Sequence, residues 1–302
     1  GPGDPGDPDD PANHLVVEQG EPEEGDDGSR LVKGTVTTVF RAPTDDDPHP
    51  GRVELKLSTA SSAPVRVTAS DGSVFTAQIV CDEDGVPVRD EAGRITVTLD
   101  PEAVGKGNLT IVQEPNGAYV GTTFSFEVTV LPDASVEPAP AVAKAVVNLT
   151  HPDGPTRPGD RLRYTVTASN GAAGSAWTDV VVTDALPSCL KLDGGSVHLT
   201  NGADLLDVDG RPAEGDGPLV PGQWRLSAPG ADGRAVLEVA CGTVYGGSSA
   251  TVTFECVVAD DAVGRDGDAA DLSNSASATG TRPNPDQDEG APPTVGPVEP
   301  DD

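Results

Sequence analysis

Basic residues are scarce in this chain of 302 residues, which holds 19 Lys and Arg against 50 Asp and Glu and carries a net charge of −31. Such a surface repels a phosphate backbone or an anionic membrane, so we expect no nucleic-acid partner. No apolar run comes near the roughly 18 residues that a membrane-spanning helix needs, so we expect no membrane span in this piece.

Methionine is absent, no signal peptide is visible, and the chain opens with Gly-Pro-Gly-Asp-Pro. We interpret the chain as an internal piece of a larger secreted protein whose signal and anchor lie outside it. Arg outnumbers Lys by 14 to 5 beside abundant Ala, Gly, Asp and Val, a composition typical of a high-GC bacterial genome. The expected location is extracellular, at the cell surface or in the cell wall.

Aromatic residues make up only 3% of the chain, and no 3.6-residue helical period persists anywhere. Short alternating runs broken by Gly, Pro, Asp and Asn recur instead, which is typical of all-β domains. The length suits two small domains plus tails. The sequence therefore predicts two tandem immunoglobulin-like β-sandwich domains with disordered acidic termini.

Charge and composition set the expected boundaries. Residues 1–30 hold ten acids and one base, and residues 281–302 hold six acids and one base, so both are predicted to be disordered. Between them we expect a first sandwich at 31–132, a Pro-containing linker at 133–140 and a second sandwich at 141–280. The clearest predicted strands are 52–59, 73–81, 94–99 and 122–131 in the first domain, and 141–147, 161–169, 176–184, 234–241, 250–258 and 271–279 in the second, with shorter ones near 197–208 and 223–227.

Two polar residues stand on the apolar faces of strands in the second domain. Alternation places Asn274 of strand 271–279 beside a leucine and alanines, and Lys144 of strand 141–147 beside valines. An unpaired buried amide costs roughly 2–7 kcal/mol, so we predict that the two side chains meet, where they can condense into an amide cross-link. The alternative is that Lys144 reaches solvent at a strand edge while Asn274 bonds to neighbouring backbone.

Three motifs follow Lys144 in order: PGDRLRYTVTASN at 158–170, VVVTDALPSCL at 180–190 and SNSASA at 273–278. Together they resemble the repeated immunoglobulin-like domain of bacterial surface proteins, long classed as a domain of unknown function. They are similar also to the isopeptide-forming domains of Gram-positive fimbrial subunits and adhesins. The resemblance covers residues 141–280. It implies that Lys144 bonds to Asn274 with the help of an acid on a middle strand, which by motif is Asp184, with Asp179 as the second choice.

Four cysteines leave several pairings open. The turn at 246–249 is expected to centre a hairpin in which Cys241 and Cys256 oppose each other on the apolar face, which predicts a cross-strand disulfide. The alternative is two buried free thiols. Cys81 and Cys189 lie in different predicted domains, and the sequence does not choose a partner for either.

Metal and catalytic signals are weak or missing. Asp204, Asp207 and Asp209 are the best calcium candidates, but their spacing does not match an EF-hand loop and favours turns instead. The nucleophile-elbow, phosphate-loop, zinc-protease and dinucleotide motifs are absent. We therefore expect no enzyme, no cofactor and no metal.

These patterns predict a structural stalk or adhesin segment of a secreted or wall-anchored bacterial surface protein, with Lys144 and Asn274 as the candidates for a self-formed cross-link. The expected partners are the neighbouring domains of the same chain and an unknown extracellular protein or glycan. One alternative is a ligand-binding module in which the first domain recognises a host protein or a glycan. Another is a noncatalytic accessory domain of a secreted enzyme.

Overall fold

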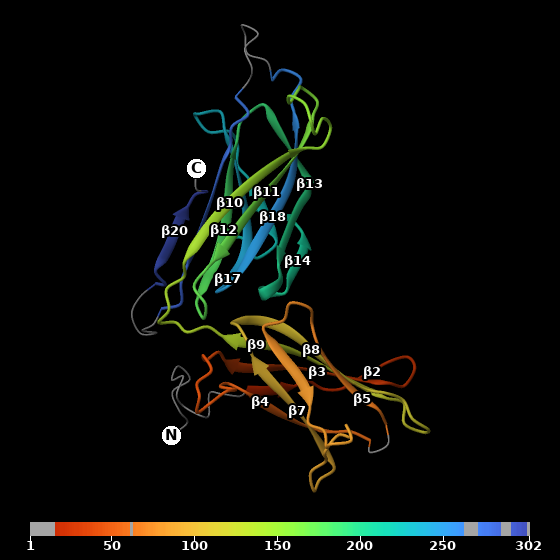
Figure 1. The fold of residues 1–302 in the computed structure, drawn as a ribbon. Coiled ribbons are helices and arrows are strands. Elements are labelled where there is room, and N and C mark those ends of the chain that lie inside the picture. Colours follow the sequence, from red (N-terminus) through yellow and green to blue (C-terminus); the bar gives the residue numbers. More distant parts are fainter. Residues whose placement is uncertain (1–15, 61–62, 263–270, 285–290, 301–302) are drawn as a thin grey trace. The chain divides into compact units, whose positions relative to one another are not determined.

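The computed structural model describes residues 16–60, 63–262, 271–284 and 291–300 (Figure 1). Apart from a 3-10 turn at Gly202–Asp204, the regular elements of these residues are all strands. The chain divides into two compact units after Asp133. Each unit is built from two β-sheets with apolar side chains between them, so the predicted all-β fold of two sandwiches is confirmed.

The first unit pairs a six-stranded sheet with a three-stranded one. The larger sheet has the order β1 (Val16–Gln19), β3 (Arg30–Val39), β9 (Thr122–Leu131), β8 (Gly105–Gln113) and β5 (Val65–Ala69), with β2 (Glu23–Glu24) on β3. The smaller sheet has the order β4 (Val53–Ser58), β7 (Arg94–Pro101) and β6 (Phe75–Ile79). Strand β9 alternates buried and partly exposed residues along its length, and Phe126 is fully buried, as a strand with one face on a core requires.

The second unit has a five-stranded and a six-stranded sheet. We call them the β18 sheet and the β12 sheet. The β18 sheet runs β10 (Pro140–Asn148), β11 (Arg161–Asn170), β18 (Ser248–Val258), β13 (Leu190–Asn201) and β14 (Leu206–Asp209). The β12 sheet runs β15 (Arg211–Pro212), β16 (Gln223–Leu226), β17 (Ala235–Tyr245), β12 (Ala176–Leu186), β19 (Ser275–Thr281) and β20 (Thr294–Val298).

The core of the second unit is filled by both sheets. Val166 and Phe254 come from the β18 sheet, and Trp177, Val182 and Leu237 come from the β12 sheet; all five are buried in one cluster. First strand β10 is an edge of the β18 sheet, whereas β19 lies inside the β12 sheet. The two strands in which the sequence placed Lys144 and Asn274 therefore belong to opposite layers of the sandwich.

The prediction that both termini are disordered is wrong in part. Strands β1 and β2 lie within residues 1–30 and pair with β3, while β20 lies within residues 281–302 and pairs with β19. In β20, Val295 and Val298 pack against the core, and the Trp177 indole donates a hydrogen bond to the Val295 carbonyl at 3.3 Å. Backbone pairing and a few apolar side chains stabilise these strands, although the prediction of disorder rested on the acidic, Pro-rich composition of the segments. The other parts of these tails include residues outside those described.

The predicted hairpin and its disulfide are also wrong. Strands β17 and β18 are joined by a tight turn, but β17 pairs with β12 and β18 pairs with β11 and β13. The turn itself is held from both layers, because Gly246 donates to the Ser175 carbonyl and Gly247 to the Asn170 carbonyl. Cys241 and Cys256 consequently lie in different sheets, and all four cysteines are free.

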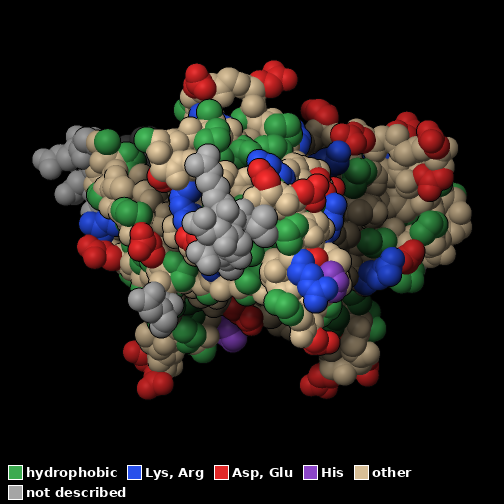
Figure 2. Space-filling model, turned by 90° about the horizontal axis from the view of Figure 1, so that it is seen from above, with side chains coloured by type: hydrophobic (Ala, Val, Ile, Leu, Met, Phe, Trp, Pro, Cys, Tyr) green, Lys and Arg blue, Asp and Glu red, His purple; other side chains and the backbone are tan. Residues whose placement is uncertain are grey.

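The acidic composition is visible on the surface. Figure 2 shows acidic side chains spread over the visible face, with basic and hydrophobic side chains between them. In the described residues, no helix has the length and apolar character that crossing a membrane requires.

Candidate functional site

Three polar side chains meet between the layers of the second unit. Lys144 reaches in from edge strand β10, Asp184 from β12, and Asn274 from the residue before β19. The Lys144 Nζ donates to Asp184 Oδ2 at 2.6 Å, and the Asn274 Nδ2 donates to Asp184 Oδ1 at 2.7 Å. Lys144 Nζ also lies 3.3 Å from the backbone carbonyl oxygen of Asn274. One carboxyl group thus contacts both the amine and the amide.

Burial sets the charge state of this cluster. The side chain of Asp184 is 1% exposed and that of Lys144 is 12% exposed. Burial lowers the pKa of the Lys144 amine, although the charge and hydrogen bond of Asp184 oppose the shift. Burial raises the pKa of the Asp184 carboxyl, which Lys144 and the Asn274 amide oppose. Both shifts favour the neutral forms, an uncharged amine beside a protonated acid.

An aromatic residue covers the amine. The Tyr164 ring centroid lies 5.1 Å from Lys144 Nζ, and the ring stacks on Phe254 at 5.3 Å. Next to the cluster is an open groove of about 690 Å³ between β10 and the start of β19, with Leu162 and Leu272 among its lining residues. Lys144 and Asn274 themselves line this groove, so the cluster borders solvent on that side.

The three side chains lie on the strand faces that the alternation in the sequence predicts. Lys144, Asp184 and Asn274 come together, and the alternative in which Lys144 points to solvent does not occur. Asp179, the second choice of acid, is exposed at an irregular position of β12 where its φ is 50°. Sequence reasoning assigned no role to Tyr164, although its inward position was apparent from alternation.

The structure separates the calcium candidates. The Asp204 carboxylate accepts a hydrogen bond from the Thr243 backbone at 2.9 Å. Asp207 and Asp209 instead flank the His198 ring, at 2.8 Å from Nε2 and 2.9 Å from Nδ1. Among the described residues, no group of three or more His, Cys, Asp or Glu side chains is placed to hold a metal ion. The three candidates are therefore not brought together as one set of ligands.

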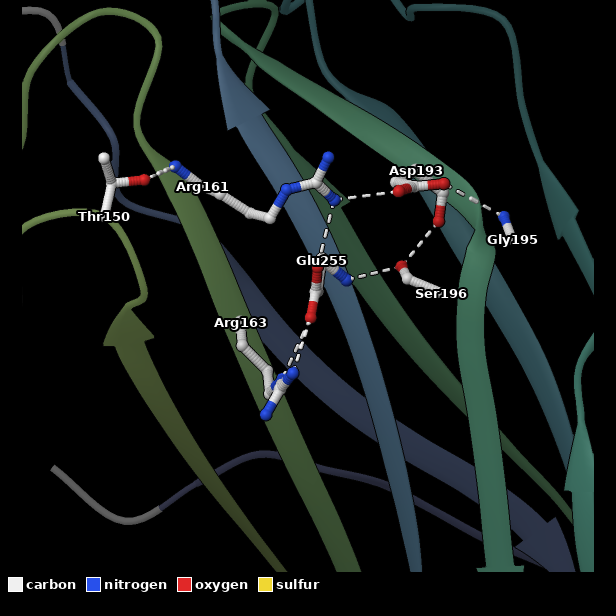
Figure 3. Close-up of polar contacts among 7 residues, drawn as sticks. All are labelled: Thr150, Arg161, Arg163, Asp193, Gly195, Ser196 and Glu255. Atoms are coloured by element: carbon white, nitrogen blue, oxygen red, sulfur yellow. Dashed lines mark hydrogen bonds and ion pairs between the residues drawn. The ribbon is translucent and has the colours of Figure 1, made fainter.

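A second polar cluster lies on the outer face of the β18 sheet (Figure 3). Arg161 donates to Asp193 at 2.8 Å and to Glu255 at 3.0 Å, and Arg163 donates to the other Glu255 oxygen at 2.7 Å. Ser196 accepts from the Glu255 backbone at 2.7 Å, in the stretch where β13 bulges away from β18. Because every charge in this cluster is paired with a neighbour, we assign it the structural role of fixing the bulge.

No family model matches the chain, and no curated protein sequence matches it. Among solved structures it is similar to the collagen-binding domain of a Staphylococcus aureus adhesin, with 8% identity over 53% of this chain and 93% of that one, at a TM-score of 0.27.

Two further structures are similar at the same level. One is the T6 backbone pilin of serotype M6 Streptococcus pyogenes, with 11% identity over 88% of this chain and 62% of that one, at a TM-score of 0.28. The other is the collagen adhesin from S. aureus, with 10% identity over 92% and 90% and a TM-score of 0.26. At TM-scores this low, the likenesses establish neither a family nor a function.

Proposed function

We propose that the second unit closes an isopeptide bond between Lys144 and Asn274, and that the chain is a load-bearing stalk or adhesin segment of a secreted or wall-anchored bacterial surface protein. The observation that carries the proposal is the position of Asp184. Its two carboxyl oxygens contact the Lys144 amine at 2.6 Å and the Asn274 amide at 2.7 Å, and its side chain is 1% exposed.

The chemistry needs only groups that are present. The uncharged Lys144 amine attacks the side-chain carbonyl carbon of Asn274, while protonated Asp184 contacts the amide nitrogen that must leave and can give it a proton. A C–N bond to Nζ forms, the C–Nδ2 bond breaks, and the proton lost by the amine reaches the leaving nitrogen through Asp184. One molecule of ammonia leaves for each amide formed. Holding the groups in contact supplies the effective concentration, and the step occurs once per chain.

Titration of the pair predicts how the rate depends on pH. The reactive form carries one proton shared between the Lys144 amine and the Asp184 carboxyl. Acid adds a second proton and charges the amine, whereas alkali removes the remaining proton from the acid. The rate is therefore expected to follow a bell-shaped pH profile that belongs to the pair.

The position of the bond suits a segment under tension. Lys144 lies on the first strand of the unit and Asn274 directly precedes β19, so 130 positions separate them in the sequence. A pull on the two ends of the unit is applied to β10 and β20, and it reaches β19 and Asn274 once β20 has separated from β19. With the bond formed, the force passes through the cross-link, and the intervening chain does not extend.

Intact mass tests the cross-link. The folded full chain is expected to weigh less than its sequence mass by one ammonia, and Asp184→Ala, Lys144→Ala and Asn274→Ala are each expected to restore the full mass. Asp179→Ala is the matched control, because this neighbouring acid on β12 points away from the cluster and its loss should leave the ammonia deficit in place. A wild-type chain at full sequence mass, or an Asp184→Ala chain that still lacks ammonia, contradicts the proposal.

A further inference from the structure

The Asn274 backbone lies beyond the end of a β-ladder. The pairing of β12 with β19 ends at Ala185 opposite Ser275, and β19 itself begins at Ser275. The residues just before it therefore receive no ladder hydrogen bonds from β12. Yet the Asn274 amide is aimed at Asp184, which lies one residue inside the ladder. Some other contact must hold this segment against β12.

Arg234 makes that contact. Its Nη1 donates to the Ala185 carbonyl on β12 at 3.1 Å and to the Ser273 carbonyl at 2.7 Å, and its Nη2 lies 3.7 Å from an Asp271 carboxylate oxygen. One guanidinium thus joins Ala185, the last residue of β12 that pairs with β19, to the residue that precedes Asn274. It takes the place of the backbone hydrogen bonds that a longer pairing of β12 with β19 would make.

The backbone from which the Arg234 side chain extends is fixed by its own hydrogen bonds and by the strand that follows it. Arg234 directly precedes β17, whose first residue pairs with Leu186 of β12. Its backbone N–H donates to the Asp232 carboxylate at 3.0 Å, and its carbonyl accepts from Gly230 at 2.8 Å, which closes the turn before the strand. The side chain is 27% exposed, so most of its length lies against the protein. The long side chain, anchored at its backbone, holds the two carbonyls in register.

We propose that Arg234 is a positioning residue for the cross-link, which sets the Asn274 side chain against Asp184 by bridging the Ala185 and Ser273 carbonyls. The inference rests on the proposed isopeptide function and extends it to a residue outside the reacting set. Arg234 touches neither the amine nor the amide, and acts through the backbone on either side of them.

An electrostatic role and a positioning role of Arg234 predict opposite effects of its removal on the reaction rate. The positive charge of Arg234 helps to lower the pKa of Asp184, against the raising effect of burial. If Arg234 acted only by its charge, its removal would leave more Asp184 protonated near neutral pH and would speed the reaction. If it positions Asn274, its removal slows the reaction at every pH.

The rate of ammonia loss separates these cases. The full chain is made by cell-free synthesis, transferred to buffers of several pH values and sampled for intact mass over time. Arg234→Ala is expected to lower the maximum rate about tenfold or more, the scale of a small misplacement of reacting groups, with the profile moved toward higher pH. Arg234→Lys, which keeps the positive charge and several N–H donors, is expected to recover part of the loss. An Arg234→Ala rate equal to or above that of the wild type overturns the inference.

Arg225→Ala is the matched control. Arg225 also donates to a backbone carbonyl, that of Gly217 at 2.6 Å, and lies in the same sheet, but its strand β16 is separated from β12 by β17. Its substitution is expected to leave the rate unchanged.

A second measurement keeps the inference separate from the cross-link. In the Lys144→Met variant no bond can form, and the side-chain amide of Asn274 can be followed by NMR through its shift and hydrogen exchange. Adding Arg234→Ala is expected to remove the signature of the hydrogen bond to Asp184. If the wild type keeps its ammonia, the isopeptide proposal fails, and the NMR comparison still decides whether Arg234 positions Asn274. An unchanged Asn274 amide signal overturns the positioning role.

Discussion

Asp184 shows how one residue can determine the chemistry of a core. A carboxyl group that is 1% exposed ordinarily costs the fold free energy, because it loses its hydration. Here its two oxygens are both occupied, one by an amine and one by an amide. The same contacts that satisfy the buried acid also bring the amine and the amide together, so under the proposed function one arrangement serves both stability and chemistry.

Gly280 gives a residue-scale test of the packing around the last strands. A Cβ at this position would lie 2.5 Å from the Thr178 carbonyl oxygen and 2.7 Å from the Trp177 indole nitrogen. Gly280→Ala is therefore expected to lower the free energy of unfolding by about 1–3 kcal/mol, as measured by denaturant titration. Gly217→Ala is the control, because a Cβ there meets nothing within 4 Å. Equal stability of the two variants would contradict this packing.

At the scale of elements, the connection between β17 and β18 carries the chain from one layer to the other. Strand β18 alternates along its length, β17 does so only in part, and the turn between them is short. What differs is the hydrogen-bonding partner, since each strand pairs with others of its own sheet. Cys241 and Cys256 therefore do not oppose each other in one hairpin, and both are free thiols.

Thiol labelling tests the crossing. Both buried cysteines are expected to resist alkylation in the native protein, because they are inaccessible and burial raises the pKa of each thiol to about 12. Cys81, which is exposed, serves as the internal control and is expected to react. Mass spectrometry with and without reductant should detect no linked pair, and a Cys241–Cys256 disulfide would contradict the free state of these thiols.

The sequence predicted those features that depend on local alternation. Strand 122–131 is observed with the predicted bounds, and the facing sides of Lys144 and Asn274 were correct because a strand has a two-residue period. The hairpin was wrong because a short turn looks the same whether its strands stay in one sheet or change layers. Arg234 was not identified, because its contacts join three segments that no local pattern connects.

The whole molecule consists of two units that each enclose an apolar core. The first unit resembles the second in architecture but carries no equivalent of the Lys144 cluster among its described residues, where Lys33, Lys56 and Lys106 lie on strands β3, β4 and β8. The two halves therefore differ in the means by which they resist unfolding. In the first, noncovalent packing alone supports the strands, and in the second the proposed bond adds to it.

Separate expression of residues 1–133 and 134–302 tests this difference. Each piece is expected to fold and unfold cooperatively, and only the second should lack one ammonia. Closing a loop of 130 positions stabilises a fold by roughly 5 kcal/mol in the chain-entropy model for cross-links, so Asn274→Ala should lower the stability of the second piece by about that amount. Calorimetry and denaturant titration provide the measurement. An Asn274→Ala variant as stable as the parent piece would count against the bond.

The span between Lys144 and Asn274 also has a topological consequence. With the bond in place, residues 144–274 form a closed covalent ring, and the loops of the second unit between these positions all lie on it. A protease that cuts one of these loops opens the ring but releases no fragment, because the two sides of the cut remain joined through the amide. β20 follows Asn274 and lies outside the ring, so a cut between β19 and β20 leaves β20 with no covalent link to the rest of the unit. A protease would thus remove the segment from β20 onward more readily than it would divide the ring itself.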